Sequence, residues 1–171
     1  MSETEKCRKR LACWCIGNGL DLGYGGDPII PTAITVDLTE PYTHVGKHPQ
    51  NLMGDASNLY WFKDNSLDYV FSSHLLEDFV DTEKVLREWL RVLKLDGRLI
   101  LYCPIEQKYR KHCLETHQPY NQSHKIENFD FYYVKDILQN KIKNVTFVYQ
   151  VDSIDIYSFE MVVQKGVSGS M

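Results

Sequence analysis

The sequence predicts an α/β fold in which a Rossmann-like, mostly parallel sheet carries helices on both faces. Seven short strands are indicated, at 19–22, 33–38, 51–55, 67–73, 98–104, 145–151 and 156–164. The strands at 67–73 and 98–104 are continuous apolar or aromatic runs, which are typical of central strands covered on both faces. The amphipathic segment 81–97 separates them, so strand, helix and strand form a right-handed βαβ unit.

The helix predicted at 81–97 has a clear apolar face. Its core-facing residues are Val85, Leu86, Trp89, Leu90, Val92 and Leu93. Asp81 is expected to cap its start and Gly97 its end. A second helix is expected at about Phe131 to Asn140. The last two strands are joined by 152–155 alone, so they must pair antiparallel.

The first half of the chain leaves little room for helices. Between Leu22 and Ala33 lies the segment "GYGGDPIIPT", which contains two prolines and barely reaches the length of a parallel crossover. The first crossover helix is therefore predicted to be reduced or absent. The polar segment 39–50 lacks a helical period and is interpreted as a loop.

Length and composition indicate one domain that binds a small molecule or a protein. The 171 residues predict a single domain at 1–165 with a flexible tail at 166–171. The net charge of −4 and the scattered basic residues make nucleic acid an unlikely partner. No apolar run is long enough for a membrane span and the N-terminus lacks a signal-peptide pattern, so a cytoplasmic location is expected. The five cysteines lack metal-site spacing, so no metal is expected.

Three acids follow three strand ends and indicate a nucleoside ligand. Asp21, Asp37 and Asp55 should converge at the carboxyl edge of the sheet, where α/β proteins bind ligands. A carboxylate at the position of Asp37 can accept both ribose hydroxyls. Asp27 stands where a dinucleotide turn has its third glycine, and its charge disfavours a pyrophosphate. S-adenosylmethionine carries no phosphate and fits better, while a nicotinamide-dependent oxidoreductase is a weaker alternative.

Two stretches carry a resemblance to a known family. The run "GDASNLYWFKDNSLDYVFSSHLLEDFVDTEKVLREWLRVLKLDGRLILYCP" (54–104), together with the turn "LDLGYGG", resembles the class I S-adenosylmethionine-dependent methyltransferases, especially the small type 11 members. The similarity covers about Gly19 to Phe131. It implies a seven-stranded sheet of order 3-2-1-4-5-7-6 with strand seven antiparallel, and S-adenosylmethionine as cofactor.

The resemblance also implies roles for individual residues. Residues implied near the methionine moiety of the cofactor are Asp21, Gly23, Tyr24 and Gly25. Asp37 would hold the ribose, Asp55 the adenine amino group, and Ala56 would lie beside the ring. Residues implied after the fourth strand, alongside cofactor and acceptor, are Ser72, Ser73 and His74. The sequence departs from the family pattern at Asp27, at the missing helix and at Asp78, where many members have histidine.

The sequence says less about which residues would bind the molecule that accepts the methyl group. His74 could be a general base, since histidine titrates near ~6.5, or could simply shape the pocket. His124 could line the acceptor pocket or be a solvated loop residue. The motifs [DN]-P-P-[YF] and Pro-Cys are absent after the fourth strand, which disfavours methylation of nucleic acid.

The resulting hypothesis is a methyltransferase that acts on a small-molecule acceptor. The alternative is a catalytically weak or inactive methyltransferase-like module that acts through a protein partner. It is motivated by the missing helix, which would leave an apolar sheet face thinly covered. A short helix within 8–15 could cover this face, or a second subunit could, which makes a homodimer possible.

Overall fold

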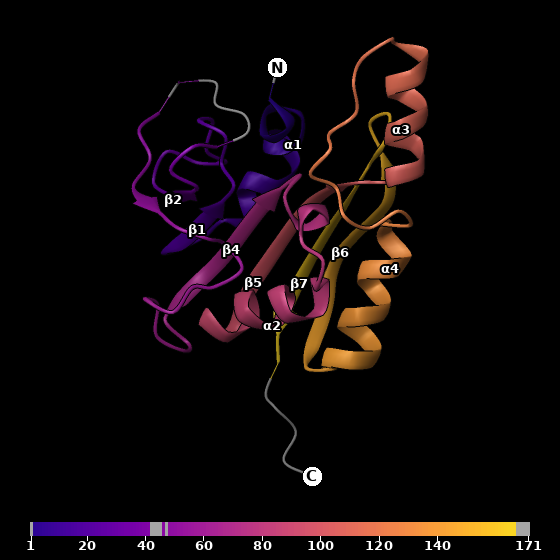
Figure 1. Ribbon diagram of the computed structural model, residues 1–171. Coiled ribbons are helices and arrows are strands. Elements are labelled where there is room, and N and C mark those ends of the chain that lie inside the picture. The colour runs from indigo at the N-terminus through magenta and orange to yellow at the C-terminus, as the bar shows by residue number, and fades with distance from the viewer. Residues whose placement is uncertain (1, 42–45, 47, 167–171) are drawn as a thin grey trace.

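The computed structural model describes residues 2–41, 46 and 48–166, and these contain one seven-stranded sheet (Figure 1). Its order is β3-β2-β1-β4-β5-β7-β6. The strands are β1 (Gly19–Leu22), β2 (Ile34–Asp37), β3 (Leu52–Met53), β4 (Leu67–Ser73), β5 (Leu93–Pro104), β6 (Val145–Ile154) and β7 (Ser158–Lys165). Strands β1 to β5 pair in parallel, whereas β7 is antiparallel to both β5 and β6. The predicted fold class and strand order are confirmed.

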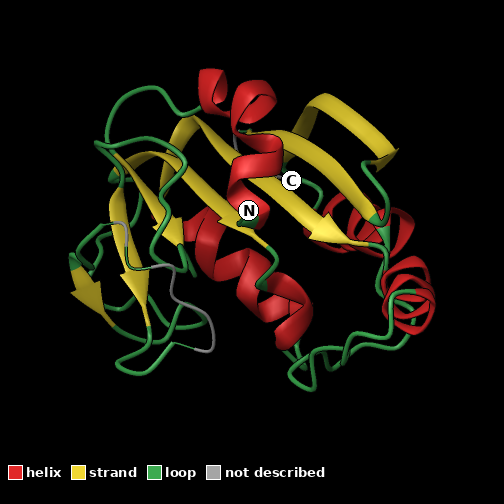
Figure 2. Cartoon of the chain, turned by 90° about the horizontal axis from the view of Figure 1, so that it is seen from above, coloured by secondary structure: helices red, strands yellow, loops and turns green. Residues whose placement is uncertain are grey.

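Helices cover both faces of the sheet (Figure 2). They are α1 (Glu3–Leu11), α2 (Thr82–Val92), α3 (Glu106–Glu115) and α4 (Phe131–Asp136), with 3-10 turns η1 (Ala12–Trp14) and η2 (Leu76–Asp78) and a π-helical turn η3 (Ile137–Ile142). On one face α2 and α4 bury Trp89, Leu90 and Val134 against β1, β4 and β5. On the other face α1 buries Cys7 and Leu11 against the central strands.

The predicted helix at 81–97 begins as expected but ends early. The Asp81 side chain accepts a hydrogen bond from the Lys84 amide at 3.0 Å and caps α2. The helix stops at Val92, because Leu93 turns extended and pairs with Leu67 of β4. Gly97 therefore lies within β5 and does not cap the helix. The sequence also gave no sign of α3, because its residues are mostly charged and just two of them, Glu106 and Cys113, are buried.

The first crossover contains no helix, as predicted. Residues 23–33 form turns and bends between β1 and β2. The face that they leave open is covered by α1, whose Cys7 and Leu11 pack in one cluster with Ile29 and Phe71. Of the predicted loop 39–50, residues 42–45 and 47 lie outside the described residues, and so does the predicted tail beyond Gly166.

Candidate cofactor and acceptor site

A cavity of about 220 Å³ lies at the carboxyl ends of β1 to β4. Its lining consists of Gly23, Asp37, Leu38, Gly54, Asp55, Ala56, Leu75, Asp78 and Phe79. Each of the four strands contributes through the loop that follows it, because parallel strands end at one edge of the sheet. Carboxylates and apolar side chains share the wall, so the cavity can hold a flat apolar ring with polar groups at its edge.

The turn after β1 is built on glycine backbone. Gly23 has a φ of +67°, and a Cβ at this position would lie 2.9 Å from Leu75 Cδ2. Glycine is therefore required both by the left-handed backbone and by the closeness of the next loop. The Gly23 amide donates to the Val36 carbonyl at 2.8 Å, which fixes the turn against β2.

Asp37 ends β2 and faces the glycine turn. One carboxylate oxygen accepts the Gly25 amide at 3.2 Å and the other accepts the Leu38 amide at 2.8 Å. These bonds orient the carboxylate, while its lone pairs still allow further donors. Asp37 and Gly25, which the sequence placed in the same site, are thus in direct contact.

Asp21 is fully buried inside β1 and does not line the cavity. Its Oδ2 accepts the Ile29 amide at 2.6 Å, whereas its Oδ1 has no hydrogen-bond partner among the described residues. Burial raises the pKa of Asp21 to about 8. An incompletely paired buried carboxylate is costly, and a cationic ligand group nearby would lower that cost.

Asp27, the departure from the family's glycine pattern, anchors the N-terminal helix. Arg8 Nη2 of α1 lies 2.7 Å from Asp27 Oδ1, and the Ser2 hydroxyl donates to the same carboxylate. Arg8 also donates to the Pro28 carbonyl at 3.1 Å. The acid therefore holds α1 over the segment from which the crossover helix is missing.

Three further predicted cofactor residues are buried beside the cavity. Ser72 and Ser73 end β4; the Ser72 hydroxyl donates to the Leu22 carbonyl at 3.3 Å, and the Ser73 hydroxyl has no hydrogen-bond partner among the described residues. Tyr24 is buried in the turn after β1, and its hydroxyl donates to the His48 carbonyl at 3.0 Å. These side chains shape the edge of the sheet more than they line the open cavity.

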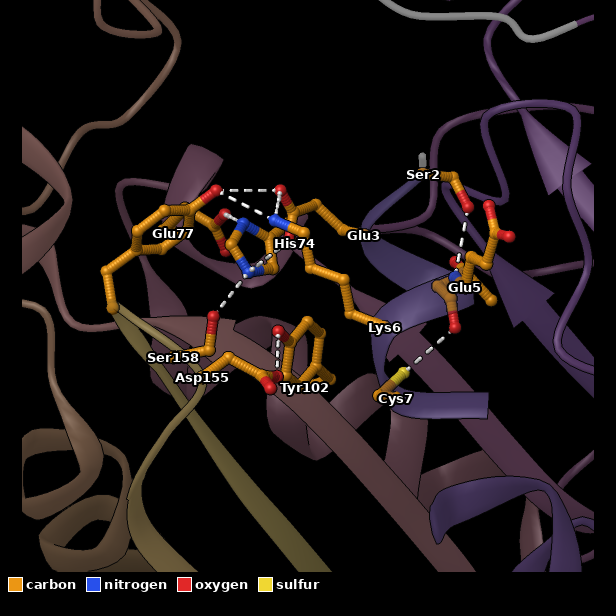
Figure 3. Close-up of polar contacts among 12 residues, drawn as sticks. Ser2, Glu3, Glu5, Lys6, Cys7, His74, Glu77, Tyr102, Asp155 and Ser158 are labelled. Carbon is orange, nitrogen blue, oxygen red and sulfur yellow. Dashed lines mark hydrogen bonds and ion pairs between the residues drawn. The ribbon is translucent and has the colours of Figure 1, made fainter. Parts of the chain in front are cut away.

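His74 follows β4 directly and is the centre of a second polar group (Figure 3). Its Nε2 lies 3.2 Å from Ser158 Oγ and 3.5 Å from Glu3 Oε2, and its Nδ1 lies 3.9 Å from Glu77 Oε1. Burial lowers the pKa of His74 to about 4, so the ring is neutral at neutral pH. The backbone of His74 is left-handed, with a φ of +49°.

His124 joins the same group from the loop between α3 and α4. Its side chain is 3% exposed, so the alternative of a solvated loop histidine is wrong. The ring Nδ1 lies 2.5 Å from Glu106 Oε2 and the Nε2 lies 3.6 Å from Glu77 Oε1. Burial of this histidine follows from its partner Glu106, which is itself fully buried at the start of α3.

Glu77 lies between the two histidines. It is fully buried, and neither carboxylate oxygen accepts a hydrogen bond from the described residues. Burial raises its pKa well above the usual range, and the neighbouring Asp78 adds to the effect. The structure thus brings together His74 and His124, which are fifty positions apart in the chain, around one unpaired acid.

A larger hollow, of about 840 Å³, lies along α2 and shares Asp55 with the cavity. We regard it as an open surface groove, because its charged side chains already pair with one another. Arg87 contacts Glu83 at 2.7 Å and Arg91 contacts Glu88 at 2.8 Å. Within residues 2–41, 46 and 48–166, no group of His, Cys, Asp and Glu side chains could hold a metal ion.

The residues at this edge fit S-adenosylmethionine better than a dinucleotide. Adenosine needs an apolar slot beside carboxylates, which Ala56, Leu75, Phe79, Asp37 and Asp55 supply. The unpaired Oδ1 of Asp21 suits a positively charged sulfonium or ammonium. A pyrophosphate would need a helix N-terminus after β1, and residues 23–33 form none.

Comparisons with known proteins agree with this geometry. Residues 20–101 match the family model described as a methyltransferase domain. The search of curated proteins found no match. Residues 20–101 are therefore similar to a methyltransferase domain, and this similarity supports S-adenosylmethionine as the cofactor.

Solved structures share the fold at low sequence identity. One is from the complex between the Haloferax volcanii Trm112 methyltransferase activator and the candidate methyltransferase, with a TM-score of 0.69, 16% identity, and coverage of 99% of this chain and 90% of that chain. A SAM-dependent methyltransferase from Archaeoglobus fulgidus gives a TM-score of 0.69, 16% identity, and coverage of 95% and 92%. One from Aquifex aeolicus gives a TM-score of 0.61, 15% identity, and coverage of 95% and 89%.

Several residues of the site escaped the sequence analysis. They are Glu3, Leu38, Gly54, Leu75, Glu106 and Phe79. Leu75 and Phe79 could have been predicted from the sequence. Apolar residues in the loop after a central strand cannot pack on a face of the sheet, so they are candidates for the lining of a cavity at its edge. Glu3 and Glu106 could not, since each reaches the site through the placement of a whole helix.

Proposed function

We propose that this protein transfers a methyl group from S-adenosylmethionine to a small-molecule acceptor. The cavity at the ends of β1 to β4 carries the proposal, because it joins Gly23, Asp37, Asp55 and Ala56 from the ends of three successive strands. This combination suits an adenosine and its ribose. We do not propose nucleic acid as the methyl acceptor. We propose that the protein acts in the cytoplasm.

In this proposal the chain binds and orients while the cofactor supplies the electrophilic methyl group of its sulfonium. Asp37 accepts the ribose hydroxyls, Asp55 accepts from the adenine amino group, and Ala56 lies against the ring. The turn residues Gly23 and Gly25 bring backbone close to the methionine moiety. Orientation of an acceptor against the methyl group lowers the barrier by up to ~7–11 kcal/mol, so a strong base is not required.

Other predicted residues complete the edge of the site. Asp21, Tyr24, Ser72 and Ser73 set its shape and charge from their buried positions. His74 and His124 belong to the acceptor side in this proposal. His74 is neutral at neutral pH, and its Nε2, which lies 3.2 Å from Ser158 Oγ, can accept a proton in one tautomer. The cavity next to His74 has a volume of about 270 Å³, which favours a small acceptor.

Calorimetric titration with S-adenosylmethionine, S-adenosylhomocysteine and NAD tests the proposal. We expect the first two to bind at micromolar Kd, equivalent to about −8 kcal/mol, and NAD not to bind. Asp37→Ala should weaken cofactor binding about 10–100-fold, since hydrogen bonds to a charged group contribute about 1.5–3 kcal/mol. The exposed acid Asp136 on α4 gives a matched control, Asp136→Ala, that should bind like the parent. Equal affinities of the parent and the Asp37 variant would contradict the ribose assignment.

A second candidate function is a methyltransferase-like module that acts through a protein partner. Two contacts favour it: Glu3 of α1 lies 3.5 Å from His74, and Arg8 ties the same helix to Asp27. The N-terminal helix thus lies against the acceptor side of the site. A structural neighbour comes from a complex with the activator Trm112, which makes a partner worth testing. Failure of the folded protein to bind either cofactor form would favour this candidate.

A homodimer is a further proposal, and its support is weaker in the structure than in the sequence. It was motivated by an apolar sheet face without a crossover helix, and α1 covers that face with Cys7 and Leu11. Measurement of the mass in solution by light scattering decides the point. A monomer at about 20 kDa would exclude the dimer, given the chain mass of 20.0 kDa.

A further inference from the structure

Unpaired carboxylate oxygens gather around His74 on the acceptor side of the site. Both oxygens of Glu77, Oε2 of Glu3 and Oδ1 of Asp78 are buried without a hydrogen-bond partner among the described residues. Native proteins leave few such atoms, because each unpaired buried polar group costs free energy. Glu77 is fully buried, so water at the surface does not explain its two unpaired oxygens.

Two of the cations near these acids are already engaged, and a third, Lys125, acts on Asp78 through its charge. Lys6 Nζ donates to Glu3 Oε1 at 2.7 Å (Figure 3). It also donates to the Tyr157 hydroxyl at 3.0 Å. Arg110 Nε donates to Glu106 Oε1 at 2.6 Å. Acids therefore surround Glu77 more closely than free cations do, and the neutral ring of His74 lies between Glu77 and Glu3.

The acids around His74 already stabilise one ammonium group of the protein itself, that of Lys6. Burial acts to lower the pKa of Lys6, but its hydrogen bonds to Glu3 and Tyr157 outweigh burial and raise the pKa. The Lys6 ammonium also lies 4.9 Å from the centre of the Tyr157 ring, at a distance typical of a cation–π contact. A carboxylate and an electron-rich ring are the groups that recognise organic cations.

A cavity large enough for a small molecule lies next to Lys6 and His74. A cavity of about 270 Å³ is lined by Lys6, His112, Asp155, Ile156, Tyr157 and Ser158. Ser158 connects it to the acids, because its hydroxyl oxygen lies 3.2 Å from His74 Nε2. Asp155 on the same wall is occupied, since it accepts the Tyr102 hydroxyl at 2.7 Å and pairs with Arg10 at 2.9 Å.

We propose that the methyl acceptor is a small primary or secondary amine, held as its ammonium in the cavity of about 270 Å³ at the Ser158 hydroxyl, next to Glu3 and His74, with Glu77 behind His74 as the acid that takes its proton. This inference rests on the proposed function. An ammonium supplies several N–H donors to carboxylates that lack them, a hydroxyl supplies one, and an anionic acceptor is repelled.

The proton and electron balance is complete with the groups present. The ammonium gives one proton to His74 Nε2 while His74 Nδ1 gives its proton to the Glu77 carboxylate, whose ionised form the ammonium has stabilised; this transfer requires the 3.9 Å between Nδ1 and Glu77 Oε1 to close to hydrogen-bond distance when the acceptor binds. The free lone pair of the amine then forms the nitrogen–carbon bond as the bond from carbon to sulfur breaks, and sulfur keeps the electron pair. His74 transfers the proton, and Glu77 stores it.

The test uses three probes of similar shape, benzylamine, benzyl alcohol and benzoate, titrated into the full chain with S-adenosylhomocysteine present. We expect benzylamine to bind at least tenfold more tightly than the other two. Glu77→Gln should remove this preference, because glutamine keeps the volume but cannot take the proton or the charge. Glu115→Gln, at an exposed acid in the last turn of α3, is the control and should retain the preference.

The outcomes separate this inference from the proposed function. S-adenosylhomocysteine is titrated first, and its failure to bind contradicts the function itself. If it binds while the three probes bind equally or none binds at millimolar concentration, the amine assignment is overturned and the methyltransferase stands. An unchanged preference in the Glu77 variant also overturns it. The melting temperature of each variant shows whether it is folded, and Glu3→Gln, on a partly exposed side chain, gives a second variant with the same expected loss.

Discussion

Arg8 Nη2 lies 2.7 Å from Asp27 Oδ1, and this ion pair joins the N-terminal helix to the turn after β1. The Asp27 side chain is 6% exposed and the Arg8 side chain is 31% exposed. Breaking the pair therefore costs more free energy at the buried carboxylate than at the guanidinium. A buried charge without its partner is destabilising, whereas an exposed arginine regains water. The pair therefore explains why an acid replaces glycine in this turn.

We predict that Arg8→Ala lowers the free energy of unfolding by about 1–3 kcal/mol, since it leaves the Asp27 carboxylate buried with fewer donors. Lys9→Ala is the matched control, because Lys9 is the next basic residue of α1 and is exposed. Urea unfolding followed by circular dichroism measures both. Equal unfolding midpoints for the two variants would show that the pair does not hold α1 in place.

The sequence predicted the sheet well, because a continuous apolar run in the sequence directly indicates a buried strand. The run "LDYVFSS" becomes β4 with unchanged bounds, and the missing crossover helix follows from two prolines in a short connection. The end of α2 was wrong, because Leu93 pairs with Leu67 through a tertiary contact that helical periodicity cannot report. Pairing overrides local propensity at such a boundary.

The candidate site was predictable where residues follow strand ends and unpredictable elsewhere. Asp37 and Asp55 line the cavity because their positions in the chain place them at one edge of the sheet. Glu77 lies beside His124 because the loop after α3 folds back, and no local pattern encodes that return. The burial of Asp21 depends likewise on Ile29 and α1 covering β1.

Trp89 links α2 to Ala56 in the cavity wall, where we propose that adenine binds. Its indole Nε1 donates to the Ala56 carbonyl at 2.7 Å in a fully buried position. We predict that Trp89→Phe lowers the free energy of unfolding by about 1–3 kcal/mol, because it removes a donor and part of the packing. It should also weaken S-adenosylmethionine binding by loosening the loop that carries Ala56.

Trp61→Phe is the control for this prediction, because Trp61 is 37% exposed and contributes less to the core. Thermal unfolding gives the stability of both variants and calorimetry gives the affinity. A Trp89 variant that is destabilised but binds with parental affinity would separate the packing of α2 from the binding of the cofactor.

Gly23 should tolerate no side chain. Its φ of +67° disfavours L-residues, and a Cβ would lie 2.9 Å from Leu75 Cδ2. Gly23→Ala is expected to cost about 1–3 kcal/mol of stability through backbone strain and to weaken S-adenosylmethionine binding at least tenfold by narrowing the cavity. Gly166→Ala serves as control, because the nearest atom to its Cβ is 3.4 Å away. Similar melting temperatures and affinities of both variants would count against the turn as a binding element.

Asp21 makes stability depend on pH in a defined direction. An aspartate in the unfolded chain has a pKa of about 3.9, whereas burial raises the pKa of Asp21 to about 8 in the folded protein. Between these values the folded state binds more protons than the unfolded state. The stability contributed by Asp21 is therefore full below about pH 4 and is lost as pH rises to about 8.

Asp21→Asn should remove this dependence, because the amide cannot ionise and its carbonyl can still accept the Ile29 amide. We expect the variant to gain stability over the parent as pH rises from 5 to 9, by about 1–3 kcal/mol at the upper end. Urea unfolding of both proteins at several pH values measures the difference, from which the other titrating groups largely cancel. If the proposed function holds, the same variant should bind S-adenosylmethionine more weakly, since the buried side chain next to the turn after β1 can no longer carry a negative charge. A constant difference in stability across this range would show that Asp21 is ionised throughout, and that a cation or donor already pairs with its Oδ1 in the folded protein.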